Sequence, residues 1–255
     1  MTDLPGLTYV GHATVRIDVA GHSILTDPVL GRTVQHVLWR HAPVPGADVA
    51  TGVDLVLISH LHHDHCDLPS LRRIGYAVPV LVPAGGGDWL SRKGFTAVHE
   101  LGIGDIYVDG DLTVRAVPAV HSGGRRGGPT ALALGYVITG RGTSTYFAGD
   151  TDLFDAMGEL VDALDVALLP VWGWGPNIGP GHLDPKRAAE GVAMLKPRLA
   201  VPIHWGTFFP IGLKPFYHKG FSSKGEEFAE HVRRLELPTE VAVTAPGSRI
   251  NDGLS

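Results

Sequence analysis

Residues 59–65 read Ser59-His60-Leu61-His62-His63-Asp64-His65, and they directly follow a continuous apolar run, Leu55-Val56-Leu57-Ile58. Such a run is typical of a strand that is covered on both faces. Four potential ligands, His60, His62, Asp64 and His65, fall within six residues and cannot share one face of a strand or a helix. They suit a loop around cations, because imidazole nitrogens and carboxylate oxygens are ligands of zinc, iron or manganese.

The alternative is a polar surface loop or an accidental run of histidines. An embedded aspartate and a preceding core strand favour the metal site, since structural context is what confirms a motif.

Three further candidate ligands occupy the same kind of position, just past the end of a strand-like run. His121 follows Val114–Val120, Asp150 follows Tyr146-Phe147-Ala148-Gly149, and His204 follows Ala200–Ile203. Taken singly, they are better explained as a loop histidine, a helix N-cap and a satisfied core histidine. Together with the first motif they complete seven ligands, which is what two adjacent metal ions require.

Composition narrows the class of protein. The chain has 255 residues, 44% of them hydrophobic and 18% charged, and its net charge is −5. These values predict a well-packed domain and exclude a disordered chain. The acidic net charge argues against a nucleic-acid partner. One cysteine, Cys66, excludes a disulfide framework. No secretory signal and no apolar run of membrane-spanning length is visible, so we expect a cytoplasmic protein.

The hydrophobic pattern predicts an α/β fold in one domain over residues 1–255. Strands are expected at Leu7–Val10, Val15–Val19, Ser23–Thr26, Leu55–Ser59, Val80–Val82, Leu112–Val117, Ala133–Ile138, Ser144–Phe147, Val166–Leu169, Leu199–Ile203 and Glu240–Thr244. Helical spacing appears at Leu68–Ile74 after Asp67, at Leu153–Leu164, after Asp184-Pro185, and around Phe228–Leu235. The last of these follows Ser223 with Glu226 three residues on, which is a capping-box pattern.

The ligand pattern resembles the metal signature of the metallo-β-lactamase-fold superfamily. Four other segments are similar to it: Gly11-His12-Ala13-Thr14, Leu25-Thr26-Asp27-Pro28, Tyr146 to Thr151, and Ile203 to Phe208. The resemblance runs from Gly11 to about Phe209 and is nearest to the branch with ascorbate-phosphate lactonase and N-acylphosphatidylethanolamine-hydrolysing phospholipase D. It implies an αββα sandwich of two mixed β-sheets flanked by helices.

The resemblance also implies which residues hold which ion. One metal would be held by His60, His62 and His121, and the other by Asp64, His65 and His204, with Asp150 bridging both. Zinc is the expected metal, with manganese or iron as alternatives. Two such ions would lower the pKa of a bridging water towards about 7, and the resulting hydroxide would attack the substrate. Asp64 is then a candidate catalytic residue that accepts or relays the proton.

Three more residues are candidates around the metals. In related proteins, an aspartate at the place of Asp27 lies behind the cluster, where it would orient histidine ligands; an ordinary Asp-Pro turn is the alternative. His12 is either such an orienting residue or a turn residue. His182, in a glycine-rich segment before a helix, is a candidate general acid or phosphate ligand, with a solvated loop histidine as the alternative. We expect His63 to point away from the metals and Cys66 to be a buried thiol.

Four residues are candidates for substrate contact. Arg125 offers positive charge after His121, Trp172 and Trp174 offer aromatic faces, and Lys214 lies in a basic, aromatic segment after His204. A mobile loop, core-capping tryptophans and an ordinary surface loop are the respective alternatives.

These features favour a binuclear metal hydrolase that acts on a small-molecule ester, first a phosphodiester in the manner of phospholipase D. A lactonase acting on a sugar-phosphate lactone is the alternative among hydrolases. An iron-dependent oxidoreductase on the same fold is the alternative of another class, and a metal-dependent sensor is a third. A homo-oligomer is compatible with the sequence.

Overall fold

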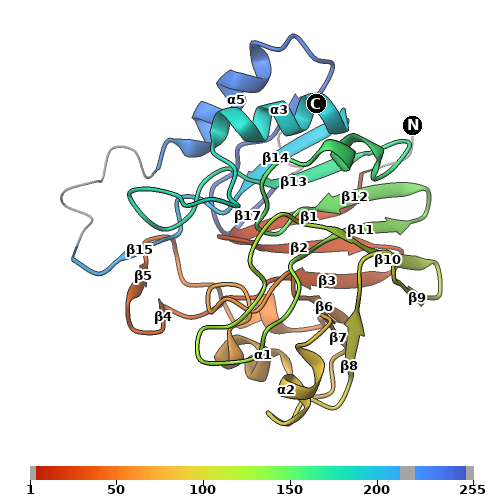
Figure 1. The fold of residues 1–255 in the computed structure, drawn as a ribbon, viewed down its shortest axis with the longest axis vertical. Helices are drawn as coiled ribbons and strands as arrows, with labels where there is room; N and C mark the ends of the chain where they lie inside the picture. Colours follow the sequence, from red (N-terminus) through yellow and green to blue (C-terminus); the bar gives the residue numbers. More distant parts are fainter. Residues whose placement is uncertain (1–3, 213–221, 251–255) are drawn as a thin grey trace.

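Two seven-stranded sheets lie face to face at the centre of the molecule, with helices on both outer surfaces (Figure 1). The computed structural model describes residues 4–212 and 222–250. One sheet has the order β17-β1-β2-β3-β6-β7-β8, and the other has the order β16-β14-β13-β12-β11-β10-β9. The predicted αββα sandwich is confirmed.

The first sheet comes from the first half of the chain and one late strand. Its strands are β1 (Gly6–Gly11), β2 (Thr14–Val19), β3 (His22–Thr26), β6 (Leu55–Leu57), β7 (Val80–Pro83), β8 (Val98–Leu101) and β17 (Ser248–Arg249). Strands β1 to β3 pair antiparallel, whereas β3, β6, β7 and β8 run parallel. The sheet is therefore mixed, as expected.

The second sheet also combines an antiparallel part with a parallel part. Its strands are β9 (Ile106–Asp109), β10 (Leu112–Pro118), β11 (Leu134–Gly140), β12 (Thr143–Phe147), β13 (Val166–Pro170), β14 (Leu199–Ile203) and β16 (Glu240–Val241). Strands β9 to β12 pair antiparallel, and β12, β13, β14 and β16 run parallel. The last strand is shorter than the predicted Glu240–Thr244.

Strand alternation explains why both faces of each sheet are buried. Leu55 and Leu57 of β6 belong to the core between the sheets, whereas Val56 and the following Ile58 belong to the core under the helices. Successive side chains point to opposite faces of a strand, so a continuous apolar run fills both layers.

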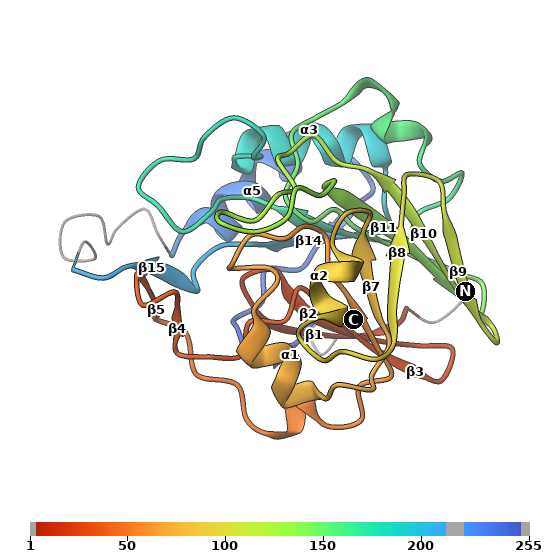
Figure 2. The ribbon, with the colours of Figure 1, turned by 60° about the horizontal axis from the view of Figure 1, so that its bottom comes forward.

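Four helices of the described residues cover the sandwich. Helices α1 (Leu68–Ile74) and α2 (Gly87–Ser91) lie over the first sheet, and α3 (Pro185–Leu195) and α5 (Lys224–Arg233) lie over the second (Figures 1 and 2). The helix starts predicted after Asp67 and at Asp184-Pro185 are confirmed: Asp67 accepts a hydrogen bond from Ser70 N, and Asp184 accepts one from Arg187 N. No helix of the described residues is long and apolar enough to cross a membrane.

Two helix predictions are wrong in part. The segment Leu153–Leu164 forms only the short 3₁₀ helix η2 (Asp155–Glu159). A second 3₁₀ helix, η1 (Asp48–Ala50), lies in the first half of the chain. Gly158 lies so close to α3 that a Cβ there would be 2.9 Å from the carbonyl oxygen of Met194. A glycine also weakens a helix interior by about 1 kcal/mol. The segment therefore follows the surface of α3.

The predicted capping box before α5 is absent. Ser223 has helical backbone angles and its hydroxyl donates to Glu227 at 2.7 Å, with no bond to the backbone. The helix ends at Arg233, so Leu235 is exposed instead of continuing the apolar face.

The sheet edge where the strands end is where the functional side chains gather. Strands β12, β13 and β14 are parallel, and β10 runs in the same direction because two antiparallel pairings separate it from β12. Their carboxyl ends therefore share one edge. A small third sheet, β4 (Thr33–Val34), β5 (Leu38–Arg40) and β15 (Phe208–Pro210), lies beside that edge.

Candidate metal centre

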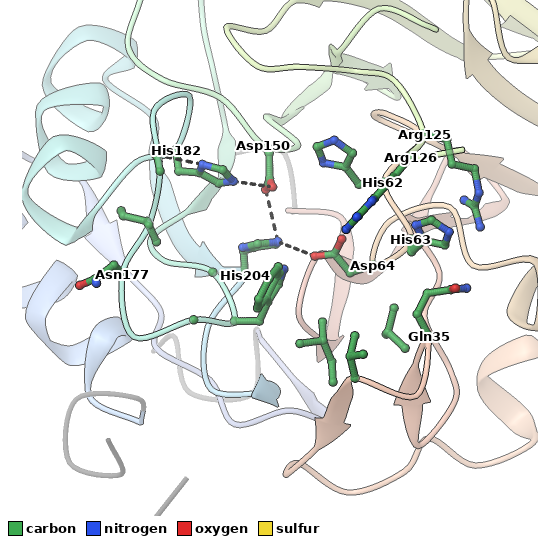
Figure 3. A pocket seen from close by; sticks show the side chains of 18 of the residues that line it. Gln35, His62, His63, Asp64, Arg125, Arg126, Asp150, Asn177, His182 and His204 are labelled. Atoms are coloured by element: carbon green, nitrogen blue, oxygen red, sulfur yellow. Dashed lines mark hydrogen bonds and ion pairs between the residues drawn. The ribbon is translucent and has the colours of Figure 1, made fainter. Parts of the chain in front are cut away.

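The structure brings all seven predicted ligands to one place, between the two sheets. His60, His62, Asp64 and His65 lie on the loop between β6 and α1. The other sheet supplies the rest, since His121 follows β10, Asp150 follows β12 and His204 follows β14. Figure 3 shows Asp150, His204 and Asp64 close together in the middle of the site.

Three histidines form the first group: His60, His62 and His121. Nε2 of His60 is 3.0 Å and Nε2 of His121 is 3.3 Å from Nδ1 of His62. Nδ1 of His121 donates to the carbonyl oxygen of Gly181 at 2.9 Å, so Nε2 of the neutral ring carries a lone pair.

His60 is held in the same way. Its Nδ1 lies 3.0 Å from Oγ of Ser59, whose own proton goes to Asp27 at 2.5 Å. Ser59 therefore accepts from Nδ1 of His60, and Nε2 of His60 also carries a lone pair. Two lone pairs face one nitrogen of His62 that can donate a single proton, whereas a cation would satisfy all three nitrogens.

The second group combines two histidines with two carboxylates. Nε2 of His65 and Nε2 of His204 are 3.0 Å apart. Nδ1 of His65 bonds Asp27 at 2.7 Å, and Nδ1 of His204 donates to the carbonyl oxygen of Trp172 at 2.9 Å. When both rings are neutral, as metal binding requires, their Nε2 atoms are acceptors that face each other.

The carboxylates close this second group. Asp150 places Oδ2 at 3.3 Å from Nε2 of His65 and Oδ1 at 3.4 Å from Nε2 of His204. Oδ2 of Asp64 lies 3.6 Å and 3.8 Å from the same two nitrogens. Oδ1 of Asp150 is buried and has no hydrogen-bond partner among the described residues. Imidazole nitrogens and carboxylate oxygens that converge in this way can bind one cation together, so the side chains present suit a metal ion.

The electrostatics of the cluster favour positive charge at its centre. Burial opposes ionisation of Asp150, but His204 and His65 hold its pKa well below the ordinary value. Burial also opposes a charge on His65, but the carboxylates of Asp150, Asp64 and Asp27 raise its pKa well above the usual range. Without an ion they therefore favour a proton on this ring, and a bound cation would take the place of that proton. Burial lowers the pKa of His121 to about 4, which keeps its ring neutral and able to bind a metal.

Asp27 and His12 lie behind the cluster. The carboxylate of Asp27 accepts from the backbone N–H of Ser59 at 2.7 Å, from its hydroxyl, and from His65. His12 is buried; burial lowers its pKa to about 3, and Nε2 bonds Oδ2 of Asp64 at 3.0 Å. Its backbone carbonyl accepts the N–H of His204 at 2.7 Å. Both residues therefore contact ligand residues directly.

His182 reaches the site from the segment before α3. Its Nε2 lies 3.5 Å from Oδ2 of Asp150, and its Nδ1 donates to the carbonyl oxygen of Gly179 at 3.1 Å. Burial works against a charge on this ring, but the bond to Asp150 raises its pKa. The side chain is 24% exposed and lines the open pocket, as it must if it contacts substrate.

A pocket of about 910 Å³ opens over the cluster. Apolar side chains on its wall are Val34, Val37, Leu38 and Ile178. Figure 3 shows Arg125, Arg126, His63 and Gln35 on one side of the central carboxylates, and Asn177 and His182 on the other. The size suits a small molecule.

Of the four predicted substrate-contact residues, two line the pocket. Arg125 and Trp174 line the pocket. Trp172 is not among the lining residues; its indole N–H donates to the carbonyl oxygen of Gly175 at 3.0 Å, and Lys224 lies 4.3 Å from its ring centre. Lys214 lies outside the described residues.

Cys66 is fully buried, and burial raises the pKa of its thiol to about 12. Its side chain lies in the apolar cluster beneath the first sheet with Leu61 and Leu71. His63 lines the outer pocket instead of joining any of the metal-binding groups found among the described residues.

The family known as the beta-lactamase superfamily domain matches residues 22–205 of this chain. This chain belongs to that family. A UPF0173 metal-dependent hydrolase from Methanopyrus kandleri is 33% identical over 259 residues, which cover 94% of this chain and 97% of the relative. N-acyl-phosphatidylethanolamine-hydrolyzing phospholipase D 1 from Caenorhabditis elegans is 30% identical over 235 residues, or 82% of this chain. The match spans 66% of that phospholipase.

A solved structure agrees with the relatives. Igni18, a metallo hydrolase from the archaeon Ignicoccus hospitalis, shares 28% identity and a TM-score of 0.72, covering 96% of this chain and 97% of the other. This β-lactamase superfamily member thus combines the fold of metal-dependent hydrolases with a His/Asp cluster able to bind metal. The metal's identity and the ligand of each ion stay predictions.

Some parts of the site in this superfamily member were not indicated by the sequence. Ser59 was quoted in the motif without a role, although it links Asp27 to His60. The pocket wall at Val34–Leu38 also had no sequence signal, because β4 and β5 are only two and three residues long. An alternating pattern needs about four residues to be recognised.

Proposed function

We propose that this protein is a binuclear metal-dependent hydrolase, most simply with zinc, and that its substrate is a small phosphodiester. The observation that carries the proposal is the convergence of Nε2 of His65, Nε2 of His204 and both oxygens of Asp150, four atoms that can bind one cation together. In this proposal His60, His62 and His121 would hold one ion, His65, His204 and Asp64 would hold the other, and Asp150 would be shared by both. A single domain provides all of these groups.

When bound, two divalent ions would polarise the scissile group and make water a nucleophile at neutral pH. The protein's own part is to place groups and move protons. His12 fixes the Asp64 carboxylate, which lines the pocket and accepts a proton from the attacking water. His182 presents Nε2 to the same space and is placed to give a proton to the leaving oxygen or to bind a phosphate oxygen.

The bonds balance for hydrolysis of a diester. The water oxygen forms a new bond to phosphorus, and the bond to the leaving oxygen breaks. The proton that Asp64 accepts ends on the leaving oxygen, either from Asp64 itself or by way of His182. No serine or cysteine nucleophile is required, which agrees with the burial of Cys66.

Two considerations favour a phosphodiester over other esters. The chain is 30% identical to a phospholipase D over 235 residues. Arg125 and Arg126 also line the pocket, and guanidinium groups suit anionic oxygens. A sugar-phosphate lactone would use the same centre and is the second candidate.

The test is turnover of a chromogenic phosphodiester by zinc- or manganese-loaded protein, with the Asp150→Ala variant alongside. We expect turnover by the wild type and none by the variant. No turnover by metal-loaded wild type would refute the phosphodiesterase assignment. Hydrolysis of sugar-phosphate lactones instead would establish the lactonase, and native protein isolated with iron and without hydrolytic activity would favour the oxidoreductase alternative.

A further inference from the structure

The loop after His121 has a fixed backbone at the pocket wall. The N–H of Gly128 donates to the carbonyl of Arg125 at 2.9 Å, which closes a four-residue turn. Gly127 has φ +71°, a value that suits the third position of a type II turn and that favours glycine. The N–H of Arg125 also donates to Pro129 at 2.9 Å. Arg126 therefore occupies the first corner of a closed turn.

Arg125 ties this turn to the ligand loop. Its Nη1 donates to the carbonyl oxygens of Leu61 and Cys66, at 3.1 and 2.8 Å. Its guanidinium also lies 4.8 Å from the ring centre of Trp89. Leu61 N in turn donates to the carbonyl of Gly123 at 2.9 Å. Arg125 is therefore largely committed to holding the loop that carries His62, Asp64 and His65.

Arg126 is in the opposite situation. It lines the pocket beside His63 and Asp64, yet it has no hydrogen-bond or ion-pair partner among residues 4–212 and 222–250. The two pocket carboxylates, Asp64 and Asp150, are engaged by histidines of the cluster. A guanidinium offers five N–H donors in a fork that matches a carboxylate or phosphate. Arg126 is exposed where it lines the pocket, so its donors can meet an anionic group that enters there.

We propose that Arg126 is a specificity-determining residue that binds an anionic group of the substrate other than the group being hydrolysed. The favoured substrates then carry a carboxylate or a phosphate on the part of the molecule that stays in the pocket on the side of Arg126 and His63. The neighbouring Arg125 supports the loop and does not make this selection. The proposal deepens the proposed hydrolase function, and it rests on that function for the placement of the reacting group.

Binding of matched phosphonates tests the selection without turnover. Propylphosphonate and 3-phosphonopropanoate differ in one terminal group, methyl or carboxylate, and butylphosphonate and 4-phosphonobutanoate repeat the comparison with a longer spacer. Titration calorimetry on zinc-loaded wild-type protein is expected to show about tenfold tighter binding of one or both carboxylates than of their partners. The preference is expected to fall to about twofold or less in Arg126→Gln.

The control is Arg92→Gln, because Arg92 is a highly exposed arginine outside the pocket lining. It is expected to keep the wild-type preference. Arg126→Lys is expected to recover only part of it, since an ammonium keeps the charge but not the fork. Equal binding of both members in both pairs by wild type, or a preference that survives in Arg126→Gln, would overturn the proposal.

Turnover separates this inference from the hydrolase proposal. The substrates are propyl and 2-carboxyethyl p-nitrophenyl phosphate, with kcat and KM measured for each. We expect the ratio of the two kcat/KM values to favour the carboxylate by about tenfold in wild type and to lose that preference in Arg126→Gln. Phosphonate selection without any diester turnover would refute the phosphodiesterase and leave Arg126 assigned. Turnover of both diesters at equal efficiency, with equal phosphonate binding, would support the phosphodiesterase and refute the role of Arg126 in selection.

Discussion

Replacing Asp27 by alanine is expected to damage both the fold and metal binding. The side chain is fully buried and accepts the backbone N–H of Ser59, the Ser59 hydroxyl and Nδ1 of His65. Hydrogen bonds to a charged group contribute about 1.5–3 kcal/mol each, and a buried donor left without a partner costs about 1–3 kcal/mol. The hydroxyl can rotate to another acceptor, so two donors are lost in full. We expect the metal-free variant to lose about 3–5 kcal/mol of unfolding free energy.

The same substitution should weaken zinc binding by about 10- to 100-fold, because His65 loses the partner that fixes its ring and Ser59 no longer positions His60. Urea unfolding of the metal-free protein measures the first effect, and competition with a chromophoric chelator measures the second. Asp54→Asn is the matched control, since Asp54 accepts a single backbone N–H from Ser23 at the surface. An Asp27→Ala protein with wild-type urea midpoint and zinc affinity would refute the orienting role.

The remaining predictions concern the cluster and its surroundings. Asp150→Ala should remove at least one metal ion per chain and nearly all activity; elemental analysis that still finds both ions would rule out the bridging position. His182→Ala should keep the metal content and lower kcat by about 10²- to 10⁴-fold, the usual contribution of an acid–base group; a wild-type kcat would reduce it to a loop residue. Cys66 should react with a thiol reagent only after unfolding, and rapid reaction of the native protein would contradict its burial.

The sequence predicted the fold where the signals were local. Asp67 and Asp184 marked the starts of α1 and α3, because a capping side chain acts within three residues of itself. The run at residues 55–58 predicted a strand buried on both faces for the same reason. Helical spacing at Leu153–Leu164 misled, since the close approach of Gly158 to α3 depends on a residue far along the chain.

In the candidate site, too, the local features could be predicted from the sequence and those that depend on distant residues could not. The spacing of residues 60–65 predicted a ligand loop, and the resemblance supplied the partners from the second sheet. The wall of the pocket could not be predicted, because β5 is held by β15, and the paired residues Arg40 and Phe208 are 168 positions apart in the sequence. Nor could the sequence separate Arg125 from Arg126. Their different roles follow from a turn and from carbonyl groups that only the folded chain brings near.

The division of the ligands between the two sheets has a consequence for how the protein matures. A growing chain has His60, His62, Asp64 and His65 after a quarter of its length, but His204 and its strand β14 come much later. Even the backbone N–H of His204 is held by His12 from the opposite sheet. The complete ion-binding cage therefore forms only after both halves have been synthesised and docked. If the proposed ligands hold two ions, full metal occupancy would therefore require a correctly assembled sandwich.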